Sequence, residues 1–348
     1  MNILVWHVHG SWTTAFVQGP HRYLLPTLPE RGPWGGGRAA AWDWPESAVE
    51  AAPEELPGTA VDVVVVQRPE EFDLARTWLR RDVPVVYLEQ NAPRGPAATS
   101  IHPVADRDDL LLVHVTAFNE LMWDNGSTPT VVVEHGIVDP GHLWTGERAA
   151  AATCINEPVR RNRVTGTDLL ARFAADAPLD VFGMGTGGIS TRDTGTGAEG
   201  RVRAYGDLPQ HELHTELARR RVYLHTARWT SLGLSLIEAM TIGLPAVAVA
   251  STAAPGAIPA RAGVCSADVA VLGEALRHFV SDPDAAATAG AAARAFALDH
   301  FGLERFLHDW DVVLDRAAGH RVVRPTRSRR AVPVPVPAAA GSFHDPRR

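Results

Sequence analysis

The stretch from Arg228 to Ala250 contains the residues whose types and spacing point most directly to chemistry. It predicts a turn that contains Gly233, a short helix over 235–242 and a buried strand over 246–250. Free backbone N–H groups at a helix start, together with the positive end of the helix dipole, suit a phosphate or diphosphate. Glu238 lies inside the predicted helix, where its carboxylate could accept hydrogen bonds from two adjacent hydroxyl groups.

The same run resembles the C-terminal signature of the retaining glycosyltransferases of family four, which have the GT-B fold. In that signature two Glu residues, with seven residues between them, frame a Gly-containing turn. The second Glu corresponds to Glu238, and the resemblance places it on the ribose of a nucleotide-sugar. The first corresponds to Thr230, an uncharged residue at the position that bonds the transferred sugar. The resemblance also assigns the diphosphate to the turn residues Ser231, Leu232, Gly233 and Leu234. An ordinary helix–strand unit with a Gly turn is the alternative interpretation.

A second segment, over 156–170, resembles the part of these enzymes that neutralises the leaving diphosphate with an Arg, four residues and a Lys. Aligned through residues 165–170, Arg160 falls on the family Arg and Thr165 on the Lys. Arg161 or Arg163 in the same loop could supply the missing charge, and solvated surface arginines are the alternative. The resemblance also places Gly183, after the strand predicted over 179–182, at the donor site.

The N-terminal part supplies the remaining candidates. A strand over 2–8 is followed by His9, Gly10, Ser11 and Trp12, and then by a helix predicted over 15–25. In the resemblance this first loop touches the acceptor or the transferred sugar; a mere strand–helix connection is the alternative. The family also has a His beside the anomeric region of the donor, where this chain has Gln90. His135, in a run that resembles the family's domain crossing, and His9 are the histidines expected to take its place. The predicted catalytic residues are therefore Arg160, His135 and Gln90.

The alternation of strands and helices defines the predicted fold. A chain of 348 residues exceeds what one hydrophobic core usually organises. Buried valine-rich strands with short Gly and Pro connections indicate parallel sheets. We therefore predict an α/β protein of the GT-B fold, with two doubly wound, Rossmann-like domains facing a cleft. The predicted domains are 1–140, for the acceptor, and 141–320, for the nucleotide-sugar, with a last helix over 303–317 that packs back. Residues 321–348 are predicted to be a disordered tail rich in Arg, Pro and Ala.

Composition excludes several other classes. The net charge of -7 argues against nucleic-acid binding. The chain has no lysine, so anionic ligands must be met by arginine, backbone amides or helix starts. Its two cysteines predict neither a disulfide framework nor a cysteine metal site. No apolar run approaches the about 20 residues that span a bilayer, and the start does not read as a signal peptide, so a cytoplasmic location is expected. Peripheral contact with a membrane stays open.

The function expected from the resemblance is transfer of a hexosyl group, with retention, from a nucleotide-diphosphate sugar to a carbohydrate, lipid or small-molecule acceptor. Neither a metal nor another cofactor is expected. In the retaining mechanism that the resemblance implies, the oxygen of the leaving phosphate takes the proton of the acceptor hydroxyl. No carboxylate base is then required, and the sequence contains no convincing pair of catalytic acids. Two alternatives remain. One is a GT-B protein that binds a nucleotide or glycan without turnover, and the other is a GT-B epimerase or phosphorylase acting on sugar nucleotides or with phosphate.

Overall fold

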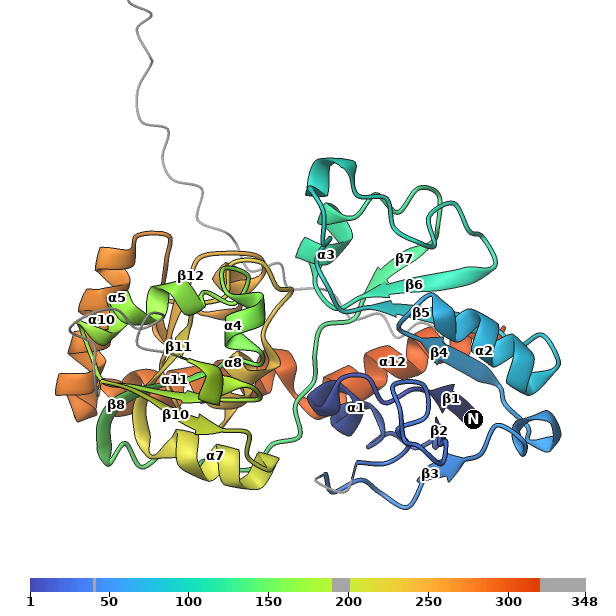
Figure 1. Ribbon diagram of the computed structural model, residues 1–348, viewed down its shortest axis with the longest axis horizontal. Coiled ribbons are helices and arrows are strands. Elements are labelled where there is room, and N and C mark those ends of the chain that lie inside the picture. The colour runs from blue at the N-terminus through green and yellow to red at the C-terminus, as the bar shows by residue number, and fades with distance from the viewer. Residues whose placement is uncertain (40–41, 190–200, 320–348) are drawn as a thin grey trace, which may run out of the picture.

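The computed structural model describes residues 1–39, 42–189 and 201–319, and Figure 1 shows them arranged around two sheets. The first sheet, in what we call the N-terminal half, has the strand order β3-β2-β1-β4-β5-β6-β7. All its neighbours pair in parallel. Its strands are β1 (Asn2–Val5), β2 (Arg22–Pro26), β3 (Ala48–Ala51), β4 (Val63–Val66), β5 (Val85–Glu89), β6 (Leu110–His114) and β7 (Thr130–Val132).

The second sheet, in the C-terminal half, has the order β10-β9-β8-β11-β12-β13, again all parallel. In both sheets the strand order reverses once, between β1 and β4 and between β8 and β11. Ligands of doubly wound sheets bind outside the carboxyl ends of the strands at such a reversal. The predicted fold class is confirmed. The strands are β8 (Arg148–Cys154), β9 (Leu179–Phe182), β10 (Val202–Gly206), β11 (Arg220–His225), β12 (Ala246–Val249) and β13 (Gly263–Ser266).

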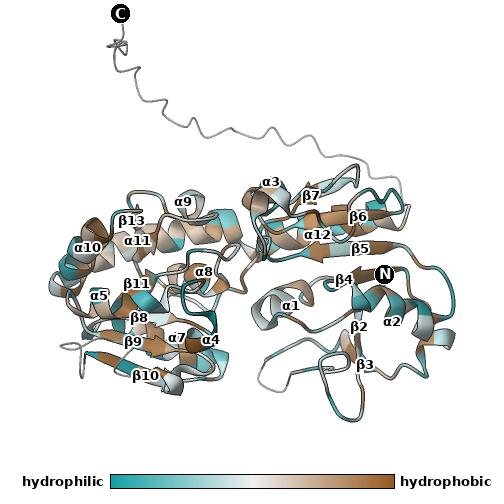
Figure 2. Ribbon diagram, turned by 45° about the horizontal axis from the view of Figure 1, so that its top comes forward, coloured by the Kyte–Doolittle hydropathy of each residue, from teal (hydrophilic) through white to brown (hydrophobic). Residues whose placement is uncertain are grey.

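Helices cover the faces of both sheets, whose strands are strongly hydrophobic, as Figure 2 shows for β5 and β6. Burial on both faces explains why these strands read as continuous apolar runs rather than as alternating ones. The helices are α1 (Gly10–Phe16), α2 (Glu70–Leu79), α3 (Ala117–Met122), α4 (Pro158–Arg161), α5 (Leu170–Ala174), α7 (Gln210–Ala218), α8 (Leu234–Thr241), α9 (Ala254–Ala257), α10 (Val269–Ser281), α11 (Pro283–Phe301) and α12 (Leu303–Ala317). Short 3-10 turns are η1 (Leu56–Gly58), η2 (Ala97–Thr99), η3 (Thr167–Leu169) and η4 (Thr186–Gly188).

The last described helix, α12, packs against the N-terminal half (Figure 1). Phe306 and Trp310, four residues apart on one helix face, are buried in the core that α1 and the sheet form. The ring of Trp310 lies 5.5 Å from that of Trp12 and 4.9 Å from that of Phe16, both edge-on. This aromatic cluster fixes α1, and therefore the loop before it, against the end of the chain.

The helix predicted over 15–25 is wrong. The structure instead has α1 over Gly10–Phe16 and the strand β2 over Arg22–Pro26. Pro20 interrupts the helical pattern, and the apolar run from Tyr23 to Leu25 is buried in β2 between β1 and β3. The elements β13 and α9 were not predicted. The domain boundary predicted at residue 140 lies between β7 and β8 and stays a prediction. The predicted tail over 321–348 lies outside the described residues.

Candidate active site

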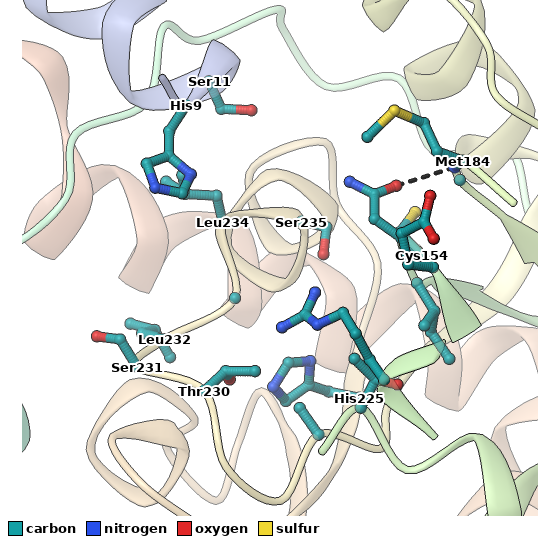
Figure 3. A pocket seen from close by; sticks show the side chains of 18 of the residues that line it. His9, Ser11, Cys154, Met184, His225, Thr230, Ser231, Leu232, Leu234 and Ser235 are labelled. Carbon is teal, nitrogen blue, oxygen red and sulfur yellow. Dashed lines mark hydrogen bonds between the residues drawn. The ribbon is translucent and has the colours of Figure 1, made fainter. Parts of the chain in front are cut away.

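A cleft of about 910 Å³ lies between the two halves, and we call it the central cleft. The loops that follow β1 and β5 line it from the N-terminal half. The loops that follow β8, β9, β10 and β11, together with the start of α8, line it from the C-terminal half. Figure 3 shows His9 of the N-terminal half close to Leu234 at the start of α8. Both strand-order reversals therefore open into the same space.

Most of the site residues predicted from the sequence line the central cleft. Trp12 and Arg163 do not. The predicted residues that line it are His9, Gly10, Ser11, Gln90, His135, Arg160, Thr165, Gly183, Thr230, Ser231, Leu232, Gly233, Leu234 and Glu238.

The structure shows why Trp12 and Arg163 lie outside the lining of the cleft. Because α1 begins at Gly10, Trp12 lies on its inward face, only 1% exposed and stacked on Phe16 with ring centres 4.6 Å apart. The side chain of Arg163 is 74% exposed and forms an ion pair of 3.2 Å with Asp168. Trp12 is therefore a core residue and Arg163 a surface one.

Glu238 lies in the second turn of α8 and is 4% exposed, with its carboxylate at the wall of the cleft. Its Oε1 accepts a hydrogen bond of 3.1 Å from Nε2 of Gln210 on α7. No side chain caps the start of α8, which follows Gly233 at the edge of the cleft. The hydroxyl of Tyr223 donates to Oγ of Ser235 in the first turn, at 2.8 Å. A fixed carboxylate and an open helix start therefore share one wall.

Thr230 and His225 both line the central cleft (Figure 3). Among the described residues no group pairs with Oγ1 of Thr230, although this atom is buried. Burial lowers the pKa of His225 to about 4, so its imidazole is neutral at neutral pH. Gly233 is packed closely against it, because a β-carbon there would lie 2.7 Å from Cε1 of His225. This part of the cleft thus offers uncharged polar groups. His225 was not predicted, although its position at the carboxyl end of β11 is the signal that could have found it.

The two adjacent arginines of α4 differ in their surroundings. The side chain of Arg160 is 71% exposed and lies 3.4 Å from a carboxylate oxygen of Glu157. Arg161 is half-buried at the cleft and forms no ion pair with any described residue. Burial, and secondarily the charge of Arg160, lowers the pKa of Arg161. Among the described residues that line the cleft, Arg161 and the exposed Arg94 are thus the arginines without an ion pair, and Arg161 is the more buried of the two.

Thr165 has neither the positive charge nor the long side chain of the lysine that the family has at this position. It is 5% exposed, and its Oγ1 bonds the carbonyl of Asn162 and the hydroxyl of Thr167, each at 3.2 Å. Its own carbonyl accepts a hydrogen bond of 2.7 Å from Thr226. Thr165 thus fastens the loop after α4 to the end of β11.

Three polar residues from the N-terminal half face this wall. Burial lowers the pKa of His9 to about 4. The pKa of His135 falls to about 3, mainly by burial and then through the nearby His9 and Arg305. Within the described chain Nδ1 of His135 has no hydrogen-bond partner. Gln90 is held by a hydrogen bond of 2.7 Å from its Nε2 to Oε1 of Gln67. At neutral pH this side of the cleft is polar without carrying positive charge on its histidines.

Trp229 joins the two halves along one side of the cleft, and it was not predicted. Its Nε1 donates a hydrogen bond of 2.7 Å to the carbonyl of Pro93, and its ring meets Phe118 edge-on at 5.6 Å. Nearby, the hydroxyls of Thr116 and Ser231 lie 3.4 Å apart across the same junction. The loop over 229–231, which follows β11, therefore rests directly on the N-terminal half.

The described residues contain neither a cluster of metal ligands nor a helix that could cross a membrane. No group of three or more His, Cys, Asp and Glu side chains is placed to hold a metal ion within 1–39, 42–189 and 201–319. In the same ranges, no helix combines the length and the apolar character that crossing a membrane requires.

Solved structures with this architecture define the class of the fold. HepE from Anabaena, solved in complex with UDP and glucose, superposes with a TM-score of 0.66 at 15% identity, covering 91% of this chain and 100% of that one. Sucrose-phosphate synthase from Thermosynechococcus elongatus gives 0.65 at 14%, with coverages of 90% and 98%. AviGT4, a glycosyltransferase involved in avilamycin A biosynthesis, gives 0.61 at 12%, with 91% and 98%. The chain therefore has the GT-B fold.

The family match is narrower and lies in the C-terminal half. Residues 172–296 match the model of the family described as glycosyl transferases group 1. The matched range contains the turn before α8 and Glu238, on which the resemblance to family four rests. No curated protein matches the chain. The protein thus carries a group 1 glycosyltransferase domain on a GT-B fold.

Proposed function

We propose that this protein transfers a hexosyl group, with retention, from a nucleotide-diphosphate sugar to an acceptor hydroxyl. One observation carries the proposal: Glu238, the open start of α8 and the unpaired Arg161 all face one cleft. The first two lie within the residues 172–296 that match the group 1 glycosyltransferases. The structures of HepE with UDP and with UDP-glucose support a donor of this kind, with UDP-glucose as the first candidate.

The donor is bound from the C-terminal half. Glu238 accepts hydrogen bonds from the two ribose hydroxyls, and its burial with Gln210 keeps the carboxylate in one orientation. The diphosphate lies at the start of α8, where the helix dipole contributes about 0.3–1 kcal/mol. Arg161 supplies the charge-assisted bond, which contributes about 1.5–3 kcal/mol. The cations and amides that neutralise the leaving group therefore come from the protein.

Transfer then needs mainly positioning and electrostatic stabilisation. The acceptor oxygen bonds to the anomeric carbon on the face from which the diphosphate departs. The bond between that carbon and the diphosphate oxygen breaks, and the acceptor proton passes to that oxygen. His9, His135 and Thr230 bond the sugar and acceptor hydroxyls as neutral groups, consistent with the lowered pKa of both histidines. They do so without adding positive charge beside an oxocarbenium-like centre.

Ligand-induced stabilisation tests the donor site. A nucleotide that binds only the native protein raises its Tm by mass action. We expect UDP or UDP-glucose, or another member of a set with GDP, ADP and TDP and their sugars, to raise the Tm of the wild type. Glu238→Ala should lose this shift, whereas Glu274→Ala, an exposed residue on α10, should keep it. No shift by any nucleotide at millimolar concentration would contradict the proposal. The anomeric configuration of the product, read by NMR, tests retention.

One observation favours a second candidate, a GT-B protein that binds the nucleotide without turnover. Thr165, at the position of the family lysine, is neutral and engaged in loop hydrogen bonds, so one of two expected cations is missing. Nucleotide binding that depends on Glu238, combined with neither hydrolysis nor transfer for any donor, would support this alternative.

A further inference from the structure

We propose that Trp42 is a stacking platform for a saccharide acceptor, and that this acceptor extends past Trp42 into a second pocket. The proposal rests on the glycosyl transfer proposed above and names the class of acceptor. A second pocket of about 570 Å³ is lined by Arg31, Gly36, Arg38, Ala39, Trp42 and Glu50. Trp42 also lines the central cleft. It therefore forms the wall that the two spaces share.

The indole of Trp42 lies against the backbone at the start of α1. A β-carbon built on Gly10 would lie 2.5 Å from Cζ2 of Trp42, so only glycine allows the ring to come so close. His9, Gly10 and Ser11 line the central cleft beside it. A molecule resting on Trp42 therefore has one end at the loop that faces the donor wall, where its hydroxyl can reach the transferred sugar.

The segment that carries Trp42 is fastened on the side of the second pocket. Trp44 is 4% exposed, and its Nε1 donates a hydrogen bond of 2.8 Å to Oγ1 of Thr14 on α1. The guanidinium of Arg38 donates to the carbonyls of Trp44 and Pro45, at 2.7 and 2.9 Å. These contacts hold the segment directly after Trp42 within the protein, and prior ordering of a binding segment lowers the entropic cost of binding.

Arg31 and Glu50 of the second pocket neutralise each other, whereas Arg38 keeps its positive charge and donates to backbone carbonyls. Arg31 and Glu50 form a two-pronged ion pair with distances of 2.9 and 3.0 Å. The bond from Arg31 is the main cause of the lowered pKa of Glu50. The backbone N–H of Arg38 adds a third donor to this carboxylate, at 2.9 Å. The lining is thus polar and paired, which suits uncharged hydroxyl groups.

The residues that line the second pocket favour one of the three acceptor classes, anionic, lipid or saccharide. A phosphate or carboxylate would need a cation with free N–H donors, but Arg31 is paired with Glu50, and both terminal nitrogens of Arg38 donate to backbone carbonyls. A lipid tail would need a continuous apolar wall, but Trp42 and Ala39 are the only apolar side chains among the described residues that line this pocket. A saccharide satisfies both features, because its C–H face packs on an aromatic ring while its hydroxyls bond the paired charges.

Binding of simple sugars tests the proposal. The probes are methyl glycosides and disaccharides of glucose, galactose, mannose and N-acetylglucosamine, measured by saturation-transfer NMR and calorimetry on the full chain with UDP present. We expect the wild type to bind at least one of them, Trp42→Ala to bind it about tenfold more weakly, and Trp42→Phe to keep most of the affinity. Trp34→Ala is the matched control, because Trp34 lines neither pocket and stacks with Arg68 in the same half.

The Tm shift with UDP separates this proposal from the proposed function. If UDP stabilises every variant and Trp42→Ala alone loses the sugar, the acceptor site is supported. If Trp42→Ala binds the sugars as well as the wild type, or if the wild type binds UDP but none of the sugars, the saccharide site is excluded. Trp42-dependent binding of a polyprenyl phosphate in detergent micelles, without sugar binding, would likewise overturn it. If UDP does not bind the wild type, the donor proposal fails. The comparison of sugar binding between the wild type and Trp42→Ala still tests the saccharide site.

Discussion

Gln210 on α7 holds Glu238 on α8 through a hydrogen bond of 3.1 Å between its Nε2 and Oε1 of the carboxylate. Both side chains line the central cleft, so the bond lies where the ligand would bind. One turn further along α7, the buried His214 lies close enough for the charge of Glu238 to oppose the lowering of its pKa by burial. The face of α7 thus supports the carboxylate on which the donor proposal depends.

Gln210→Ala should therefore weaken donor binding without removing the group that binds. The freed carboxylate samples more orientations, and the loss of one hydrogen bond to a charged group corresponds to about 1.5 kcal/mol or roughly tenfold in affinity. We expect the KM for the donor to rise by about tenfold with a smaller change in kcat. His211→Ala, an exposed neighbour on the same helix, is the control. Equal losses of kcat in both variants would mean that Gln210 only supports the helix.

Arg161 rather than Arg160 should carry the charge at the diphosphate. Arg161 is unpaired at the cleft and Arg160 is exposed beside Glu157, so truncating them should have unequal effects. We expect Arg161→Ala to lower kcat/KM about 10- to 100-fold and Arg160→Ala to lower it by less than about threefold. Arg161→Lys should restore part of the loss because it keeps the charge without the fork. Steady-state kinetics of UDP release measure both losses of kcat/KM. A larger loss in Arg160→Ala than in Arg161→Ala would mean that Arg160 binds the diphosphate.

The choice between these two arginines shows where sequence reasoning ends. Both are in the segment that resembles the family, but they are neighbours on a single helical turn and so face different ways. The direction of that turn is set by left-handed backbone at Glu157 and Asn162, with φ of 57° and 30°, which composition does not reveal. By contrast, Thr230 lies in the turn before α8 and Glu238 lies within α8. Their positions relative to each other therefore follow from the local sequence alone.

Long-range contacts account for the other omissions. Trp229 reaches Pro93 across 136 residues, and Trp42 meets the cleft only because β3 and its approach fold back against α1. The residues adjacent to Trp229 and Trp42 in the sequence form no pattern that predicts either contact. Trp12 was misplaced because the helix start was set too late, and a shift of α1 changes which of its side chains face the core. The two parallel sheets, which depend on hydrophobic runs and their spacing, were predicted well.

Buried neutral histidines should make stability fall as the pH drops below neutrality. The pKa of His135 is about 3 in the folded protein against about 6.5 in the unfolded chain, so between these values the unfolded state binds more protons. The free energy of unfolding then decreases with falling pH by up to about 1.4 kcal/mol per pH unit for each such group. His135→Asn should reduce this slope, measured as ΔG of unfolding in urea from pH 7 to 4.5. The exposed His211→Asn should leave it unchanged, and equal slopes in all three proteins would contradict the prediction.

Trp229 should couple the contact between the halves to the position of the sugar. It precedes Thr230, and its indole donates to Pro93 at 2.7 Å while packing edge-on against Phe118. Trp229→Phe removes the hydrogen bond, which contributes about 1 kcal/mol, together with part of the ring area, whereas Trp229→Ala removes the whole ring that spans the junction. We expect kcat to fall several-fold in the first variant and further in the second, with the Tm shift by UDP nearly retained, because Glu238 and α8 are untouched. Trp78→Phe, whose ring stacks on Trp6 away from the cleft, controls for the loss of an indole. If the UDP shift were lost together with kcat, Trp229 would instead be shaping the donor wall itself.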